Sequence, residues 1–281
     1  MQTFDLIDYV VPRGGIYNVI GMKDGKLIPK FTNSLETAYE ISEEFSEQNT
    51  DVYFALGKLK EKGNRKVDNV ESLGAIWLDI DCGAGKAEEI EPSTGLPKGY
   101  ASQAEGAKAL KVFCGVVDLP EPTIVNSGYG LHVYWAFTEE VPTEKWIPIA
   151  QRLKEICVTQ KFYADPNVFD PARILRVPGT YNQKKATPRL VKVINVAPER
   201  HAPDTIRELL NVNSDAVVKK PSVQTVLDPL QKLLAQNQDY KFSKIISRQD
   251  PCLQLKDSLM NRATLSEPRW FNALSVAKFC Q

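Results

Sequence analysis

The sequence predicts an α+β fold built around one antiparallel sheet that carries its helices on one face. Short segments rich in β-branched and aromatic residues alternate with amphipathic helical segments along most of the chain. From Gly74 onward these elements follow the order strand, helix, strand, strand, helix, strand, which is typical of ferredoxin-like and RNA-recognition-type sheets. We therefore expect one face of this sheet to be free for a functional site.

The first part of the chain contributes two strands and a helix. Residues 15–22 and 51–57 are rich in β-branched and aromatic residues and are bounded by glycine, which predicts strands. Between them, residues 35–48 have helical periodicity and follow Ser34, a favourable N-cap residue.

The elements after Gly74 are predicted from the same signals. A strand over 74–82 precedes a loop rich in glycine and proline that extends to Gly99. The later elements are a helix over 102–117, strands over 123–127 and 131–137, a helix over 143–160, and strands over 173–179 and 188–195. Residues 211–225 are polar and contain proline, which predicts a linker, and helices are predicted within 226–238, 251–260 and 266–280.

Charge is balanced overall but segregated along the chain. The 281 residues include 35 basic and 35 acidic side chains, so the formal net charge is zero and no global field predicts a partner. Residues 35–51 hold six acidic residues and no basic one. Residues 171–192 hold no acidic residue and six basic ones, namely Arg173, Arg176, Lys184, Lys185, Arg189 and Lys192. This basic stripe is either an anion-binding surface or an ordinary solvated one.

Cysteine and histidine usage excludes several classes of site. The five cysteines are scattered without a CxxC pair, and the chain has only two histidines. We therefore predict neither a disulfide framework nor a zinc site. The pattern fits a reducing compartment, and no apolar run is long enough to span a bilayer. We expect a cytoplasmic protein without a membrane partner.

Two acidic residues interrupt the apolar strand "GAIWLDIDCG", residues 74–83. Because side chains alternate across a strand, Asp79 and Asp81 share one face, while Leu78 and Ile80 share the other. The two carboxylates would be roughly 6–7 Å apart at Cα, which invites a divalent cation with oxygen ligands, Mg²⁺ or Mn²⁺. The alternative is an aspartate pair that faces solvent at a strand end.

The segment "NSGYGLHVYW" is the second candidate motif. Gly128 and Gly130 permit a tight turn whose main-chain amides can approach an anion. On the strand that follows, alternation turns His132 toward the same open face as Asp79, whereas Leu131 faces the core. The alternative is a histidine with only a structural role.

The third segment is "FDPARILRVPGTYNQKK". Strand alternation predicts that Arg176 faces the site and that Arg173 lies off it. Asp170 is a candidate third metal ligand, and Lys184 and Lys185 extend the positive charge into the following loop. The alternative is a capped turn with surface cations.

These three segments, in this order and spacing, resemble the motifs of the archaeo-eukaryotic primase superfamily, in particular the primase-polymerases of phages and plasmids, over residues 15–195. The resemblance implies a nucleotidyltransferase that makes or extends primers on a single-stranded DNA template from nucleoside triphosphates. It implies that Asp79, Asp81 and Asp170 are catalytic and hold two Mg²⁺ or Mn²⁺ ions. The residues implied to hold the nucleotide are Ser127, Gly128, Gly130, His132, Arg176 and Lys184, with Arg173 as a further candidate.

One departure from the family affects the nucleotide site. Some relatives carry a lysine in the turn of the second motif, where this chain has Gly128 and Gly130. The charge of the triphosphate would then rest more on Arg176 and Lys184.

The resemblance also suggests how the chain is organised. We predict a catalytic domain over 1–210, a linker over 211–225 and a helical region over 226–281. The helix predicted over 266–280 is apolar on nearly every side, whereas a terminal helix normally keeps a polar outer face. We therefore interpret the helical region as the start of a further part, a fused or partner helicase. The alternative is a last helix buried against the catalytic domain.

The motifs fit three other functions less well. A rolling-circle nuclease would need paired histidine ligands, and "LHVYW" offers one histidine. A non-catalytic single-strand-binding module would present exposed aromatic residues in place of three acids. An ATPase would need a phosphate-binding loop, which "CGAGKAEE" does not complete, so Lys86 is interpreted as an ordinary loop residue.

Overall fold

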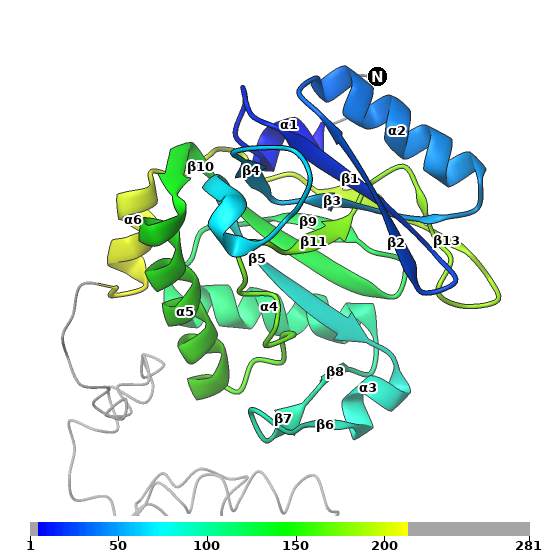
Figure 1. The fold of residues 1–281 in the computed structure, drawn as a ribbon. Helices are drawn as coiled ribbons and strands as arrows, with labels where there is room; N and C mark the ends of the chain where they lie inside the picture. Colours follow the sequence, from blue (N-terminus) through cyan, green and yellow to red (C-terminus); the bar gives the residue numbers. More distant parts are fainter. Residues whose placement is uncertain (1–4, 213–281) are drawn as a thin grey trace, which may run out of the picture. The chain divides into compact units, whose positions relative to one another are not determined.

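Two antiparallel sheets form the body of the molecule, for which a computed structural model describes residues 5–212. The first sheet has the strand order β11-β3-β1-β2. Helix α2 (Leu35–Glu47) covers this sheet (Figure 1), and the Ser34 side chain accepts a hydrogen bond from the Thr37 amide, as an N-cap does. The strands are β1 (Tyr17–Lys23), β2 (Lys26–Thr32), β3 (Asp51–Ala55) and β11 (Ile174–Arg176).

The second sheet carries the strand with the aspartate pair near its centre. Its order is β14-β9-β10-β5-β4, and β8 pairs in parallel with the end of β5. The strands are β4 (Gly57–Leu59), β5 (Val70–Cys82), β8 (Gly99–Tyr100), β9 (Thr123–Asn126), β10 (Gly130–Pro142) and β14 (Lys192–Asn195).

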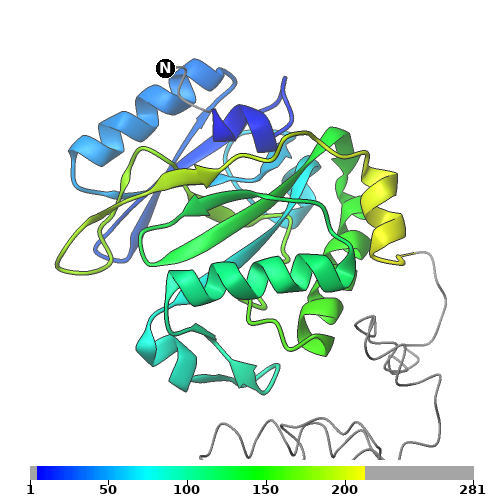
Figure 2. The same ribbon diagram turned by 180° about the vertical axis from the view of Figure 1, so that it is seen from behind.

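Helices and short elements complete the described residues. Helices α4 (Gln103–Val117) and α5 (Thr143–Thr159) contact β5 and β10, and Figure 2 shows α4 from the opposite side. The other helices are α1 (Leu6–Val10), η1 (Val67–Asn69), α3 (Ala84–Glu88) and α6 (Pro203–Leu209). The remaining strands are β6 (Ile90–Glu91), β7 (Leu96–Pro97), β12 (Tyr181–Asn182) and β13 (Arg189–Leu190).

The apolar face of β5 anchors the core. Leu78 and Ile80 are completely buried. Helix α4 approaches closely because Gly106 has no side chain: a Cβ there would lie 3.3 Å from both Ile80 and Cys82. These contacts fix β5 and leave the alternate positions, which include Asp79, turned away from α4.

Helix α5 lies against the same strand through a pair of tryptophans. The rings of Trp77 and Trp146 are 4.7 Å apart between centroids. The Trp146 Nε1 donates to the Ala75 carbonyl (2.7 Å), and the Trp77 Nε1 donates to the Val168 carbonyl (2.7 Å). Both indole N–H groups are therefore satisfied although the rings are buried, which stabilises the position of β5.

The predicted α+β class with antiparallel sheets is confirmed, but parts of the predicted arrangement are wrong. The helices do not share one face of the sheet: α4 packs on Ile80 and α5 packs on Trp77, and these two side chains point to opposite faces of β5. The face that carries Asp79 is therefore partly covered by α5. Strands β5, β10 and β9 are adjacent, as the split pattern predicts. The last strand of that pattern, β11, pairs instead with β3 of the other sheet. Strand β11 was expected to pair with the free edge of β5. That edge pairs instead with β4 and β8, and between them the Asp165 amide donates to the Asp79 carbonyl.

The predicted linker from residue 213 onward and the helices predicted after it lie outside the described residues. Within residues 5–212, no helix is long and apolar enough to cross a membrane.

Candidate active site

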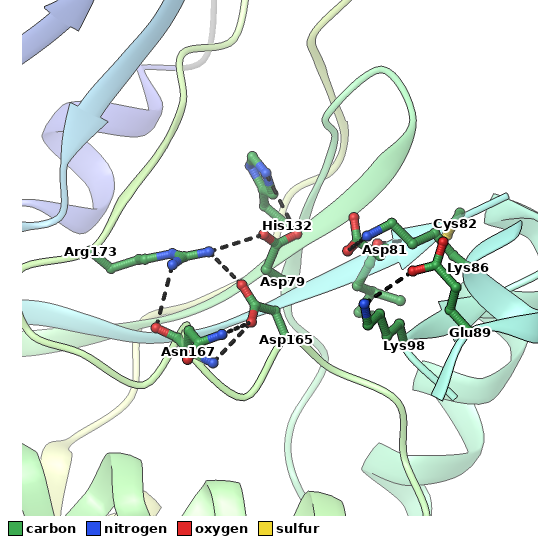
Figure 3. A network of polar contacts seen from close by, with 11 residues as sticks. Asp79, Asp81, Cys82, Lys86, Glu89, Lys98, His132, Asp165, Asn167 and Arg173 are labelled. Carbon is green, nitrogen blue, oxygen red and sulfur yellow. Dashed lines mark hydrogen bonds and ion pairs between the residues drawn. The ribbon is translucent and has the colours of Figure 1, made fainter. Parts of the chain in front are cut away.

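The first two sequence motifs meet across one pair of strands. Strands β5 and β10 are antiparallel with His132 opposite Asp79 and Gly130 opposite Asp81. The Nε2 atom of His132 lies 3.9 Å from Asp79 Oδ1 (Figure 3). The register therefore brings together the aspartates, the histidine and the glycine turn, as the alternation of side chains predicts.

Asp79 carries a charge that the fold does not fully compensate. Its side chain keeps 19% of its exposure. Burial, followed by repulsion from Asp81, raises the pKa of Asp79 to about 7, although Arg173 and Arg176 act in the opposite direction. Two carboxylates that share a site disfavour each other's ionised form. A cation bound between them would restore that form.

His132 is neutral at physiological pH. Burial, with repulsion from Arg176 and Arg173 acting in the same direction, lowers the pKa of its imidazole to about 3. Its Nδ1 atom is buried and has no hydrogen-bond partner among the described residues. A neutral imidazole can donate from one nitrogen and accept at the other, so His132 retains hydrogen-bonding capacity for a ligand.

A third acid lies beside Asp79, and it is Asp165. The Asp165 amide donates to the Asp79 carbonyl (2.9 Å), and its carboxylate holds the Arg173 guanidinium at 2.5 Å. Asp165 also raises the pKa of Asp79 by charge repulsion. In Figure 3, Asp165 and Asp79 point toward the same guanidinium, and Asn167 closes the turn by donating to Asp165 Oδ1.

Asp170, the predicted third ligand, is not brought to this cluster. It is exposed, and its side chain accepts a hydrogen bond from the Ala172 amide (2.8 Å), so it caps a turn, the alternative given above. The segment "DPNVFD" contains two acids, and Asp170 is the one nearer the basic strand. The turn signal in Asp165-Pro166-Asn167, directly after a long helix, could have identified the other.

The predicted position of Arg173, off the site, is also wrong. Its guanidinium lies 3.8 Å from Asp79 Oδ2, although strand alternation turned it away from the site. Strand β11 begins only at Ile174, so Arg173 belongs to the preceding turn and the period of two does not apply to it.

Arg176 lies near the site but is bound elsewhere. Its buried guanidinium is paired with Asp51 of β3 and lies over the Tyr53 ring, 4.7 Å from the centroid. Its charge still lowers the pKa of His132. Arg176 therefore joins β11 to β3 within the first sheet and contributes positive potential to the site, while its donor capacity is partly used by Asp51.

The glycine turn packs against β12, which lies within the basic segment 171–192. Gly128 has φ +96°, and a Cβ there would lie 2.8 Å from Asn182. The Ser127 amide donates to the Gly130 carbonyl (3.0 Å), and Asn182 Nδ2 donates to the Ser127 carbonyl (2.7 Å). The turn is thus fixed with little space above it, which only glycine permits at position 128.

Basic side chains gather around the tip of this turn. Lys185 and Arg189 each lie 4.4 Å from the centroid of the Tyr129 ring, and the Tyr129 hydroxyl donates to the Thr187 carbonyl (2.6 Å). Lys184 is exposed, and its amide donates to Asn182 Oδ1 (3.1 Å). Part of the predicted basic stripe therefore forms one surface with the glycine turn.

The carboxylates of the site are of the type that binds a hard divalent cation, but in this structure they are paired with lysine and arginine side chains. Within residues 5–212, no three acidic, histidine or cysteine side chains come together closely enough to hold a metal. Instead, Arg173 pairs with Asp165, and the Lys86 ammonium lies 2.8 Å from Asp81 Oδ2. Lys86 is therefore part of an ion pair at the site, not an isolated loop residue. The raised pKa of Asp79 indicates that these two cations do not neutralise the cluster fully.

The chain is similar to part of a replication protein and to several solved structures. No family model matches the chain. A replication protein of Clostridium perfringens is 28% identical over 150 residues, which are 52% of this chain and 32% of the relative. The chain thus matches about a third of that protein's length.

Similar solved structures are also primases or polymerases by name. They are the AEP domain of the cyanophage S-2L primase-polymerase (17% identity, TM-score 0.48, covering 70% of this chain and 89% of that one), primase RepB' (13%, 0.43, 93% and 81%), and the polymerase domain of Mycobacterium tuberculosis ligase D in complex with DNA (16%, 0.39, 70% and 71%).

Proposed function

We propose that residues 5–212 form the catalytic part of a template-dependent primase-polymerase of the archaeo-eukaryotic primase superfamily. The enzyme would transfer nucleotides to make or extend primers on single-stranded DNA during phage or plasmid replication. The observation that carries the proposal is the register of β5 and β10, in which Asp79 faces His132 and Asp81 faces the Gly130 end of the glycine turn. Acids for metal ions and donors for phosphate are thereby adjacent.

Asp79 and Asp81 would hold Mg²⁺ or Mn²⁺, and Asp165 would join them when its carboxylate is released by Arg173. Their oxygens are the ligand type that these ions prefer, and Asp79 and Asp81 repel each other, which a bound divalent cation would relieve. When bound, two such ions supply charge neutralisation at the attacking and leaving oxygens of phosphoryl transfer. Arg173, which is 3.8 Å from Asp79 and 28% exposed in its side chain, would then be free to contact phosphate.

The nucleotide would be bound by donors on the glycine turn and β10. The main-chain amides of the turn suit the phosphates, apart from that of Gly128, which donates to Asn126 Oδ1 (2.8 Å). The neutral His132 supplies an uncharged hydrogen-bond donor. Lys184 is exposed beside the turn, whereas Arg176 would act mainly through its charge because it is paired with Asp51. Phosphoryl transfer depends on such positioning and charge stabilisation.

The template would contact the basic surface around Tyr129. Lys185 and Arg189 combine positive charge with the face of an aromatic ring, which is the pairing that single-stranded nucleic acid binds without sequence preference. A helicase partner, fused or separate, stays a proposal that the sequence beyond residue 212 motivates.

The proposal is tested by labelled-nucleotide incorporation with the full chain on single-stranded circular DNA. Reactions with and without a primer, with ATP or deoxynucleotides, and with Mg²⁺ or Mn²⁺ separate priming from extension. We expect metal-dependent, template-directed product. Single-strand binding without any incorporation under all of these conditions would indicate the non-catalytic module instead.

A further inference from the structure

Lys86 belongs to none of the three motifs, yet its ammonium lies in the candidate site. Its Nζ is 2.8 Å from Asp81 Oδ2, and the two side chains keep 33% and 38% of their exposure. The hydrogen bond to Asp81 raises the pKa of Lys86, and the charges of Glu89 and Asp165 act in the same direction. The ammonium is therefore charged and lies in the field of two of the site's acids.

A small folded segment holds Lys86 in this position. The Gly83 amide donates to the Tyr100 carbonyl (2.8 Å), and the Lys86 amide donates to the Gly83 carbonyl (2.9 Å). Strand β8 then runs parallel to the end of β5, with Gly99 opposite Asp81. The chain thus leaves β5, forms α3 and returns to the same strand. Lys86 is presented to Asp81 by this closed segment.

The same end of β5 carries the glycine turn on its other side. Gly130 is opposite Asp81 across β10, as Gly99 is across β8. A Cβ at Gly130 would lie 2.5 Å from the Ile80 carbonyl, so the main chain of the turn approaches β5 closely. Phosphates bound to this turn would therefore lie at the end of β5 where the Lys86 ammonium is held.

A divalent cation and the ammonium would compete for Asp81. A hard divalent ion forms shorter bonds to carboxylate oxygen and carries twice the charge, so it would displace the lysine. The lysine has a flexible stem and three donors that can turn to a new acceptor. The main-chain donors of the glycine turn are uncharged, and the cations beside it, Lys185 and Arg189, contact the Tyr129 ring. Lys86 would supply a cation to the polyphosphate from the β8 side of β5.

We propose that Lys86 is a phosphate-binding residue of the nucleotide site. Without metal, Asp81 holds its ammonium; when metal occupies Asp79 and Asp81, the ammonium moves to the polyphosphate of the incoming nucleoside triphosphate. This inference rests on the proposed function, because it takes the ligand to be a nucleoside triphosphate.

The test compares Lys86→Ala with Lys98→Ala by calorimetric titration of the full chain. Lys98 is a matched control, because it lies on the same segment and forms one ion pair, with Glu89 at 3.1 Å. The probes are Mn²⁺ alone and dATP at saturating Mn²⁺, both without template, and thermal melting checks that each variant is folded.

For Lys86→Ala we expect Mn²⁺ to bind as tightly as in the wild type or more tightly, since a competing cation is gone. The affinity for dATP should fall about tenfold or more, as for a lost charge-assisted hydrogen bond. Lys86→Arg should restore most of this affinity, and Lys98→Ala should change neither titration.

Unchanged dATP affinity in Lys86→Ala, with normal dATP binding by the wild type, would overturn the assignment of Lys86 and leave the proposed function standing. An equal loss of Mn²⁺ and dATP affinity would also overturn it, because Lys86 would then only position the acids. Failure of the wild-type chain to bind dATP with Mn²⁺ would instead count against the proposed function itself.

Discussion

The main-chain amide of Asp165 donates a 2.9 Å hydrogen bond to the main-chain carbonyl of Asp79. This bond lies on the edge of β5 between the segments paired with β4 and β8. It fixes the loop after α5 beside the aspartate pair, and it directs the Asp165 carboxylate to Arg173, which also approaches Asp79. The loop thereby brings the side chains of Asp165 and Arg173 to the site from a part of the chain that is distant in sequence.

The first prediction distinguishes the two acids of this loop. Asp165→Asn should lower Mn²⁺ affinity and reduce nucleotide transfer strongly, because a carboxylate of the metal cluster is lost. Asp170→Asn should have little effect on either, since Asp170 is exposed and caps a turn. Both quantities are measured by calorimetry and by primer extension. If Asp170→Asn loses more Mn²⁺ affinity and transfer than Asp165→Asn does, Asp170 is the third ligand, as the sequence predicts.

The second prediction separates the two arginines by stability. Arg176→Ala should lower the free energy of unfolding by about 3–5 kcal/mol, because it leaves the buried Asp51 carboxylate unpaired. Arg173→Ala should cost about 1 kcal/mol or less, because its ion pair with Asp165 is partly exposed. Urea unfolding measures both values.

For nucleotide transfer, the order of the two variants should be the reverse of their order in stability. Where both proteins are folded, Arg173→Ala should reduce nucleotide transfer more than Arg176→Ala does, because only Arg173 reaches Asp79. If Arg176→Ala is as stable as the wild type and is the more impaired variant in transfer, the expectation from strand alternation was correct and the structural assignment is wrong.

The third prediction concerns pH in the protein without metal. The pKa of Asp79 is about 7 in the folded state and near its ordinary 3.8 in the unfolded chain. Between these values the folded state binds a proton that the unfolded state has released. The contribution of Asp79 to stability therefore falls as pH rises through this window and is level above it.

Asp79→Asn should remove this contribution, and Asp24→Asn, in an exposed turn, is the control. The difference in unfolding free energy between wild type and Asp79→Asn is measured from pH 4 to 8. His132 contributes an opposite slope, because its pKa is lowered to about 3, and it is present in both proteins. Saturating Mg²⁺ should abolish the fall, since a bound cation favours the ionised carboxylate. A difference that does not vary with pH would refute the raised pKa.

The fourth prediction concerns the template. Replacing Lys185 and Arg189 by alanine should flatten the salt dependence of single-stranded DNA binding. The log–log slope should decrease by roughly 1.4 if each residue contacts one phosphate of a single strand. The double variant Lys26→Ala with Lys62→Ala removes two exposed lysines elsewhere and should keep the wild-type slope. Equal slopes in all three proteins would exclude the surface around Tyr129.

The strands that carry the site could be predicted from the sequence because their signals are local. Strand β5 alternates apolar and acidic positions, and β10 begins at a glycine turn, so the shared face of Asp79 and His132 followed from the period of two. The helix predicted over 143–160 corresponds to α5 for the same reason. Strand β2 was not predicted, because its exposed lysines and proline resemble a turn region more than a buried strand.

The rest of the site depends on contacts between distant residues, which periodicity does not encode. Arg173 and Asp165 reach Asp79 because a loop follows the edge of β5, and Lys86 reaches Asp81 because α3 folds back to β8. The partner of Arg176 is Asp51, which belongs to a strand far along the chain. The assignment of β11 to the first sheet likewise depended on its pairing with β3.

The central claim is that Asp79 and Asp81 form the metal-binding centre of a nucleotidyltransferase. The most direct measurement is the rate of primer extension by the full chain with Mn²⁺, compared between wild type, Asp79→Asn and Asp81→Asn. Thermal melting establishes that the variants are folded. We expect template-directed extension by the wild type and none above background by either variant. Each variant should melt at or above the wild-type temperature without metal, because a repelling charge is gone. Extension at the wild-type rate by either folded variant would contradict it.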